Sequence, residues 1–325
     1  MTFFLLSGCG RKTYRIVFTA IPESKEEIHF IKSDGTGHRN LTTGSSWQYS
    51  PTWSPDGTKL AYINEVNGDT NIWILDFTNN SKYQLTTGES NSSPAWSPDG
   101  KRLAFVAKTA GFLQIFVINS DGSGRRQLTG NASDNWSPAW SPDGKSLAFV
   151  SNRNGDTSIY KMSSDGNHQL NLTGNSHFND SPVWSPDGKL IAYRTQINNN
   201  YDIAVINADG TGGKNLTANC AADDEHPVWS PDGSRLAFVS KRNGNEDIYV
   251  MKRNGAGLTR LTFNNGADRW PSWAPDGSAI VYTSFIDTNW ETCVTGLNEG
   301  GKFVNLTKTP LNEFEPFCAP KMDQD

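Results

Sequence analysis

Residues 182–188 read Pro-Val-Trp-Ser-Pro-Asp-Gly, and this stretch decides the fold because the chain repeats it. A Trp-Ser/Ala-Pro-Asp-Gly block starts at six positions: Trp53, Trp96, Trp140, Trp184, Trp229 and Trp273. The spacings are 43, 44, 44, 45 and 44 residues, and a Leu-Thr pair keeps the same step from Leu41 to Leu306. A fixed period of this length indicates a repeat architecture. The chain is therefore one structural unit repeated along its length rather than two unrelated domains.

Each repeat is predicted to form four short antiparallel strands. In the repeat around Trp184 we expect them at 182–185, 191–194, 203–206 and 216–217. The turn after the first strand follows from its residues, because Pro presets φ, Asp bonds to nearby amides and Gly takes the left-handed position. Apolar residues alternate and no helical period is present, which favours strands. Four-stranded blades of this length pack radially into an all-β propeller, with each repeat tryptophan between blades.

The chain ends determine the number of blades. Residues 15–42 match the second, third and fourth strands of a repeat, and the missing first strand is predicted at 316–320, with Cys318 at the tryptophan position. Six complete repeats and one blade split between the N- and C-termini give seven blades, and this closure removes two open sheet edges. The alternative is six blades with loose terminal strands. In both cases 15–325 is predicted to be a single propeller domain.

Composition excludes several classes of protein. The net charge of −5 provides no basic surplus for phosphate contacts, so nucleic acid is not an expected partner. With 11 Trp, 16 Phe and 9 Tyr, the chain has ample material for a core and is not predicted to be disordered. Beyond residue 9 no apolar run approaches the roughly 18 residues of a membrane-spanning helix.

The first 14 residues are predicted to be a short lipoprotein-like signal or anchor segment. Leu6-Ser7-Gly8-Cys9 resembles the bacterial lipobox, which predicts lipidation of Cys9. The segment is shorter than an ordinary signal peptide and lacks a basic start, so the alternatives are a true start upstream or an accidental match. Lipidation would place the domain in the periplasm or on a membrane facing it, attached only through the lipid.

The repeat motif carries a family resemblance. Pro-x-Trp-Ser-Pro-Asp-Gly followed by Leu-Ala-Phe-Val, Asp-Ile-Tyr-Val, Asp-Gly-x-Gly and Leu-Thr resembles the TolB-type (WD-like) β-propeller repeat over about residues 15–320. The resemblance is to the propeller alone, without the α/β domain that precedes it in TolB. Similar repeats occur in peptidases and in oligogalacturonate lyases, so the resemblance implies the fold and leaves function to the site. No Gly-x-Ser-x-Gly nucleophile motif accompanies the repeats.

The binding site is expected on the face opposite the uniform Ser-Pro-Asp-Gly turns, where the loops differ between repeats. Residues just before each first strand should encircle the mouth of the central channel. This ring is aromatic and mostly acidic, and Trp and Arg are common interface anchors. The candidate partner-binding residues are Tyr49, Trp136, Asp180, Glu225, His226, Arg269, Trp270 and Glu315.

Two functions are consistent with this ring. By resemblance, the first is a non-catalytic, monomeric binding scaffold of the bacterial cell envelope that engages a protein partner and needs no cofactor. The alternative is a lyase-like, polysaccharide-acting enzyme or a carbohydrate-binding propeller. In it the acidic residues and His226 would act as general acid and base or hold a divalent cation. The recurrent Asp of the turns is explained by turn chemistry without a metal.

Two cysteines replace aromatic residues of the repeat. Cys318 stands at a tryptophan position, and Cys293 stands where another blade has Tyr249. Both are interpreted as small core residues. The alternative is a disulfide between them in an oxidising compartment.

Overall fold

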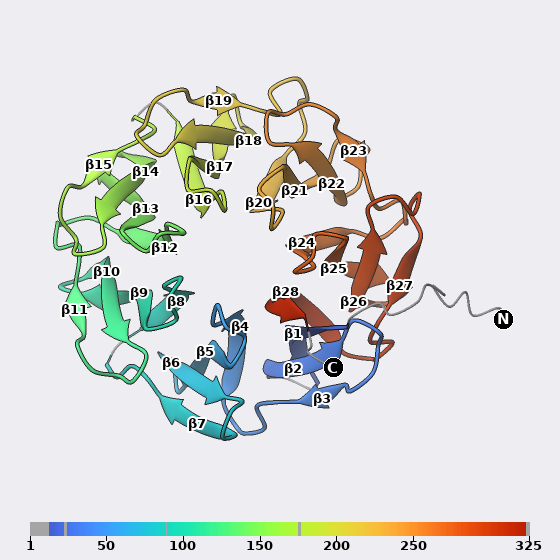
Figure 1. Ribbon diagram of the computed structural model, residues 1–325, viewed down its shortest axis with the longest axis horizontal. Helices are drawn as coiled ribbons and strands as arrows, with labels where there is room; N and C mark the ends of the chain where they lie inside the picture. The colour runs from blue at the N-terminus through green and yellow to red at the C-terminus, as the bar shows by residue number, and fades with distance from the viewer. Residues whose placement is uncertain (1–12, 23–24, 89, 175–176, 323–325) are drawn as a thin grey trace.

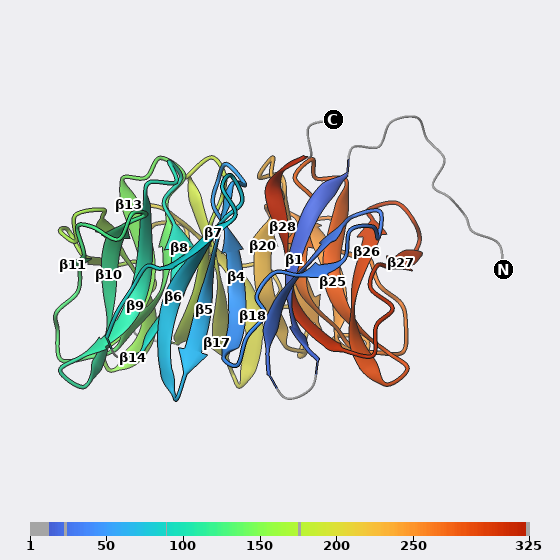
Figure 2. The ribbon, with the colours of Figure 1, turned by 90° about the horizontal axis from the view of Figure 1, so that it is seen from below.

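The computed structural model describes residues 13–22, 25–88, 90–174 and 177–322, which form 28 β-strands. Seven four-stranded antiparallel sheets are arranged as blades around a central axis (Figure 1). Seen from the side, the strands run between the two faces of a disc (Figure 2). No helix in this described part of the chain is long and apolar enough to span a bilayer.

Three blades follow one another along the first half of the chain, each with its first strand nearest the axis (Figure 1). Blade 1 contains β4 Trp47–Trp53, β5 Lys59–Val66, β6 Asp69–Asp76 and β7 Ser81–Gln84. Blade 2 contains β8 Asn91–Trp96, β9 Arg102–Thr109, β10 Phe112–Asn119 and β11 Arg126–Gln127. Blade 3 contains β12 Asn135–Trp140, β13 Ser146–Asn154, β14 Asp156–Ser163 and β15 Leu170–Asn171.

Three further blades have the same order. Blade 4 contains β16 Phe178–Trp184, β17 Leu190–Ile197, β18 Asn200–Asn207 and β19 Lys214–Asn215. Blade 5 contains β20 Asp224–Trp229, β21 Arg235–Ser240, β22 Asp247–Lys252 and β23 Thr259–Arg260. Blade 6 contains β24 Asp268–Trp273, β25 Ala279–Ile286, β26 Asn289–Gly296 and β27 Phe303–Asn305.

Blade 7 is split between the two ends of the chain. Its strand order is β28 Asn312–Met322, β1 Tyr14–Ile21, β2 Glu27–Lys32 and β3 Arg39–Asn40. The innermost strand thus comes from the C-terminus, and it pairs antiparallel with β1 so that Ile16 lies opposite Cys318. The predicted closure and the count of seven blades are confirmed, and the six-blade alternative is wrong.

The repeat tryptophans join neighbouring blades. The indole N–H of Trp140 donates to the carbonyl of Ala95 in the preceding blade at 3.1 Å, and Ala95 directly precedes the tryptophan of that blade. The other five make the same bond: Trp53 to Phe317, Trp96 to Thr52, Trp184 to Ala139, Trp229 to Val183 and Trp273 to Val228. At the seventh position the Cys318 thiol lies 3.9 Å from the Ser272 carbonyl. The tryptophan therefore provides both packing and a satisfied polar atom at six of the seven interfaces.

The Leu-Thr pair has a structural role of the same kind. Leu172 is buried, and the hydroxyl of the next residue, Thr173, accepts a hydrogen bond from the Ile159 backbone N–H at 3.0 Å. The bond recurs in each blade, with acceptors Thr42, Thr86, Thr129, Thr217, Thr262 and Thr307. It satisfies a third-strand amide beyond the end of a very short fourth strand, where the sheet offers no backbone partner.

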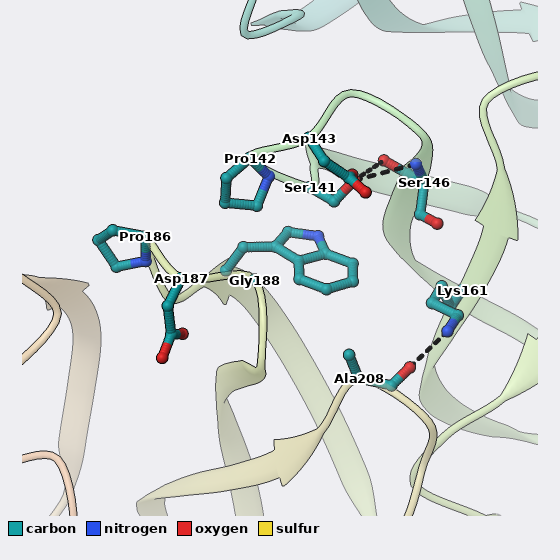
Figure 3. Close-up of a pocket in the computed structure, with 10 residues that line it drawn as sticks. Ser141, Pro142, Asp143, Ser146, Lys161, Pro186, Asp187, Gly188 and Ala208 are labelled. Carbon is teal, nitrogen blue, oxygen red and sulfur yellow. Dashed lines mark hydrogen bonds between the residues drawn. The ribbon is translucent and has the colours of Figure 1, made fainter.

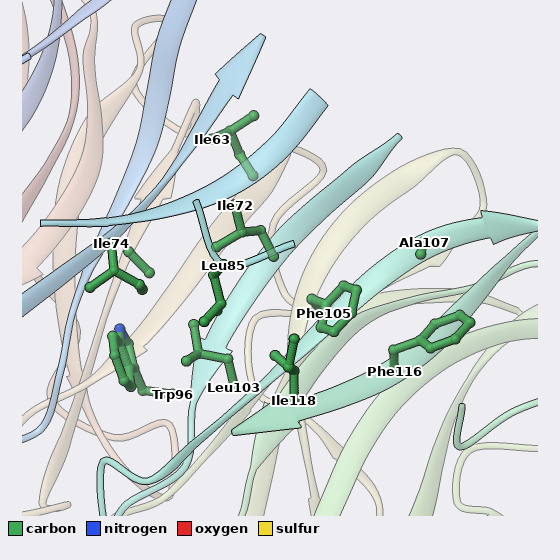
Figure 4. Packing of buried hydrophobic residues seen from close by; sticks show 11 residues of the cluster. Ile63, Ile72, Ile74, Leu85, Trp96, Leu103, Phe105, Ala107, Phe116 and Ile118 are labelled. Carbon is green, nitrogen blue, oxygen red and sulfur yellow. The ribbon is translucent and has the colours of Figure 1, made fainter. Parts of the chain in front are cut away.

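The hydrophobic core lies between blades. Figure 4 shows one such layer, in which Ile72 and Leu85 of blade 1 pack with Trp96, Leu103 and Phe105 of blade 2. Cys293 is buried in the equivalent layer between blades 5 and 6, opposite Tyr282 on β25. Cys293 and Cys318 are both free thiols, so the small-core interpretation is confirmed and the disulfide alternative is wrong.

The turns have the predicted chemistry. In blade 4 the Ser185 hydroxyl donates to Asp187 Oδ1 at 2.6 Å, and the same oxygen accepts from the Lys189 amide at 3.1 Å. Gly188 has φ +69°, a conformation that glycine adopts without steric cost. We call the face formed by these turns the turn face, and the opposite face the loop face.

Candidate functional site

The predicted ring residues lie inside the first strands, not just before them as expected. Each first strand of blades 1 to 6 contains a β-bulge at this point, as between Asp180 and Val183 in β16. In every blade the bulge contains two consecutive ring residues, such as Asp180 and Ser181 in β16, followed by a proline. The second of the two has a positive φ between 50° and 55° in all seven blades. These residues are Ser50, Ser93, Ser137, Ser181, His226, Trp270 and Glu315. We call the seven pairs, each consisting of one of these residues and the residue before it, the bulge ring.

Proline explains where the bulge lies. It has no N–H for the sheet ladder, so within a sheet it is confined to edge strands and bulges. A left-handed conformation costs a non-glycine residue roughly 1–2 kcal/mol. Because the same conformation recurs at the equivalent residue of all seven blades, we interpret it as a built-in feature of the repeat. A bulge bends the strand and re-aims its side chains, and such bulges concentrate at functional sites. The ring thus brings together residues from every blade at one level around the axis.

Asp180, Glu225 and His226 form one cluster with Arg194, a residue that sequence reasoning missed. The Arg194 guanidinium donates to both carboxylate oxygens of Asp180, at 2.8 and 2.5 Å, and lies 3.2 Å from Glu225. His226 Nδ1 lies 3.9 Å from the other Glu225 oxygen. The hydrogen bond to Asp180 raises the pKa of Arg194 above its ordinary value. The arginine holds both carboxylates in one fixed network.

The repeat itself contained a signal for Arg194. It pairs with Asp180 across the hairpin, and the equivalent positions in blades 1, 2, 3, 5 and 6 are Ile63, Val106, Val150, Val239 and Thr283. A charged residue in place of a core aliphatic residue, opposite an acid, predicts an ion pair.

Arg269 and Trp270 form a second cluster with Glu246, Trp290 and Phe314. Arg269 Nε donates to Glu246, and the guanidinium lies 4.9 Å from the Trp290 ring. Trp270 meets Trp290 and Phe314 edge-on, with ring centroids 6.0 and 5.6 Å apart. Such T-shaped pairs are favoured because the edge of one ring is electropositive and the face of the other electronegative. The result is a rigid, half-buried aromatic surface at the interface of blades 6 and 7.

Tyr49 and Glu315 form a third cluster at the junction of blades 7 and 1. The Tyr49 hydroxyl donates to Glu65 at 3.2 Å, and the Ser50 hydroxyl donates to Glu315 at 3.1 Å. Partial burial, together with the charges of Glu65 and of Glu26 nearby, raises the pKa of Tyr49 to about 12. The tyrosine is therefore a neutral hydrogen-bond donor at physiological pH.

Trp136 is not grouped with the other candidates. It is half-buried and packs against core residues on both sides of blade 3. Here the structure supports the inter-blade packing role rather than an exposed anchor. Within residues 13–22, 25–88, 90–174 and 177–322, no group of three or more His, Cys, Asp or Glu side chains could hold a metal ion.

The turn face carries two hollows. One, of about 500 Å³, lies between the turns of blades 3 and 4 and is lined by Asp143, Lys161, Trp184 and Asp187 (Figure 3). The other, of about 380 Å³, lies near the axis and is lined by prolines and by Trp53, Trp229 and Trp273. In the first hollow Asp143 is engaged by the Ser141 hydroxyl at 2.6 Å and by the Lys145 amide. Asp143, like Asp187 in the next blade, therefore stabilises its own turn by accepting hydrogen bonds.

The predicted lipidation site, Cys9, lies outside the described residues. The segment 1–14 is described only from residue 13 onward.

The fold and its bulge ring define a class, the seven-bladed propellers built from a repeat with an inter-blade tryptophan. The family model of the TolB β-propeller domain matches residues 9–228 and 211–304. The chain belongs to this family.

Individual relatives match over shorter stretches. The chain is 42% identical over 76 residues to the protein TolB homolog of Protochlamydia amoebophila, which covers 23% of this chain and 15% of that protein. It is 35% identical over 66 residues to the Tol-Pal system protein TolB of Desulfosudis oleivorans, covering 20% of this chain and 15% of that protein. Each match thus spans well under two thirds of the relative's length.

Solved structures share the fold. TolB from Acinetobacter baumannii superposes with a TM-score of 0.62 at 22% identity, covering 95% of this chain and 67% of that one. An oligogalacturonate lyase in complex with manganese gives a TM-score of 0.70 at 17% identity, covering 91% and 85%. At these identities the likeness extends to the architecture alone.

Proposed function

We propose that this chain is a non-catalytic binding propeller of the bacterial cell envelope that engages a protein partner through its loop face, in a Tol-Pal-type system. The observation that carries the proposal is the bulge ring. It holds a different pair of side chains at each blade on a rigid scaffold, whereas the turn face repeats one turn. Variable side chains on a fixed frame are the usual basis of recognition. The relatives named as a TolB homolog and as a Tol-Pal system protein TolB support the proposed setting.

The electrostatics of the ring favour binding over acid–base catalysis. Asp180 and Glu225 are both held by Arg194, at 2.5 and 3.2 Å, so neither is a free base or a free proton donor. Arg269 is likewise held by Glu246. Arginine and tryptophan fixed in this way are the kind of residues that dominate the binding energy of protein interfaces.

The accompanying proposals concern assembly and location. The propeller acts as a monomer, because β28 pairs with β1 and so the split blade offers no open β1 edge to a second copy. It is located in the periplasm, with Cys9 as a lipid anchor.

Affinity capture from envelope extracts tests the function. A loop-face variant, Arg269→Ala with Trp270→Ala, is compared with wild type and with a turn-face variant, Asp187→Ala with Arg253→Ala. The control removes an ion pair of similar kind, whose charged atoms are 3.1 Å apart on the other face. We expect the loop-face variant to lose the partner and the control to retain it. Equal retention by both variants would remove the proposed site, and glycan turnover abolished by His226→Ala would favour the polysaccharide-acting alternative.

A further inference from the structure

Three glutamates converge at the junction of blades 7 and 1. Glu315 lies in the bulge of β28, Glu65 on β5 and Glu26 just before β2. Their charges act on one another, since the pKa of Glu26 is raised by burial and then by repulsion from Glu315 and Glu65. All three are half-buried, so each keeps some exposure to solvent.

Among the described residues, these carboxylates have no cationic partner. Within the described part of the chain, no Lys, Arg or His forms an ion pair with Glu26, Glu65 or Glu315. Lys25, the nearest basic residue in sequence, donates its ammonium to the Ser45 carbonyl instead. Their described hydrogen-bond donors are the neutral hydroxyls of Tyr49 and Ser50.

Several other acids near the bulge ring have cationic partners. Asp180 and Glu225 share Arg194, Asp223 lies 3.3 Å from Lys241, and Glu246 contacts both Lys241 and Arg269. Glu26, Glu65 and Glu315 differ from these acids in having no ion pair among the described residues. Partly buried charges of one sign are destabilising when unpaired, and a cation would relieve their repulsion.

An aromatic surface adjoins this charge. Phe314 directly precedes Glu315 in the same bulge, and its ring lies 6.2 Å from Trp290 and 5.6 Å from Trp270. Phe285, which is 38% exposed, extends the surface with its ring 5.4 Å from Trp290. The Trp290 ring already receives the Arg269 guanidinium at 4.9 Å, so this cluster is suited to cation–π contact.

We propose that the aromatic surface and the adjoining glutamates, Glu26, Glu65 and Glu315, receive a lysine- or arginine-bearing segment of the protein partner. The glutamates take its charged groups, and Phe314, Trp290 and Phe285 pack against its alkyl stems and guanidinium planes. The inference rests on the proposed protein-binding function and adds the chemistry of the partner: charge complementarity selects a basic segment over an acidic or neutral one.

Calorimetric titration with defined peptides tests this. The probes are acetylated, amidated pentalysine, pentaglutamate and a neutral Gly-Ser pentamer, each titrated at low and at physiological salt into the full-length protein. We expect pentalysine alone to bind, more weakly as salt increases. The triple variant Glu26→Gln, Glu65→Gln, Glu315→Gln should weaken it about tenfold, or ~1.4 kcal/mol. Trp290→Ala should weaken it without changing the salt dependence.

The matched control changes the same net charge elsewhere. Asp121→Asn, Asp165→Asn and Asp209→Asn alter three exposed turn-face residues, at a turn position where blade 5 already has Asn254. Pentalysine affinity should be unchanged in this variant. Equal weakening in both triple variants, or wild-type binding no tighter than that of the neutral pentamer, would overturn the proposal. Capture of the envelope partner could still depend on Arg269 and Trp270 while pentalysine does not bind. In that case the proposed basic segment of the partner is wrong and the proposed function stands.

Discussion

Asp268→Asn is expected to stabilise the protein at neutral pH. Asp268 is fully buried between blades 5 and 6, and Asn264 donates to its Oδ1 at 3.1 Å. Its Oδ2 has no hydrogen-bond partner within the described residues. Burial, with the Asp247 charge as a lesser cause, raises the pKa of Asp268 from 3.8 to about 6. The chain uses a neutral amide, Asn91, at the same position of blade 2, where its Nδ2 donates to Asn71 at 3.1 Å.

The magnitude follows from the pKa. A rise from 3.8 to about 6, at roughly 1.4 kcal/mol per pKa unit, makes the ionised form cost about 3 kcal/mol at pH 8. The folded protein holds this proton more tightly than the unfolded chain does. The contribution of Asp268 is therefore most favourable at low pH and is lost as the pH rises from about 4 to about 6. The amide removes the cost, so the gain should be up to about 3 kcal/mol at pH 8 and about 1 kcal/mol at pH 4.5.

Urea unfolding followed by tryptophan fluorescence at both pH values measures the gain. The reciprocal substitution Asn91→Asp provides the matched comparison, because it introduces a carboxylate at the equivalent, fully buried position. It should destabilise the protein at pH 8 and much less at pH 4.5. The reasoning is refuted if Asp268→Asn lowers the free energy of unfolding at pH 8, or if its gain is the same at both pH values.

Substitutions at three further positions test the repeat. Trp140→Phe removes the indole that bonds to the Ala95 carbonyl, and should lower the free energy of unfolding by about 1–3 kcal/mol in a denaturation curve. Thr173→Val leaves the Ile159 amide unsatisfied at similar cost, whereas Thr173→Ser should be near neutral, and equal effects of the two would contradict the role of the hydroxyl. Ser137→Gly relieves a φ of +50° and should stabilise by up to about 1 kcal/mol by thermal melting, and a loss of stability there would argue against backbone strain.

The period of the repeat made the fold predictable. The tryptophan forms the same hydrogen bond in six blades and the Leu-Thr pair forms its bond in all seven, so both recur at a fixed step that can be read directly from the chain. Cys318 could be assigned to the tryptophan position because its neighbours keep the proline spacing. Strand bounds were less predictable: β16 begins at Phe178, four residues before the predicted start, because pairing continues through the bulge.

The candidate site was only partly predictable. The ring positions were found, but a residue before proline ordinarily adopts an extended conformation, so no local rule predicts the left-handed φ of Trp270. Glu65 meets Tyr49 and Trp290 meets Trp270 within one blade, whereas Glu246 meets Arg269 across two blades. No motif of the repeat marks these three partners, so the contacts appear only in the folded structure. Trp136 is the first residue of its ring pair and Trp270 is the second, but the neighbours that each would meet could not be read from the sequence. Trp136 packs into the core layers beside blade 3, whereas Trp270 meets Trp290 and Phe314.

The most direct test of the loop-face proposal is photo-crosslinking in living cells of the organism that carries the gene. A photoreactive amino acid is placed at His226 or Phe285 on the loop face, and at Asp99 or Asp187 on the turn face. The loop-face positions should give a discrete adduct with one envelope protein, and the turn-face positions should give none. Adducts formed only from the turn face, or none from either face, would contradict the proposed binding surface.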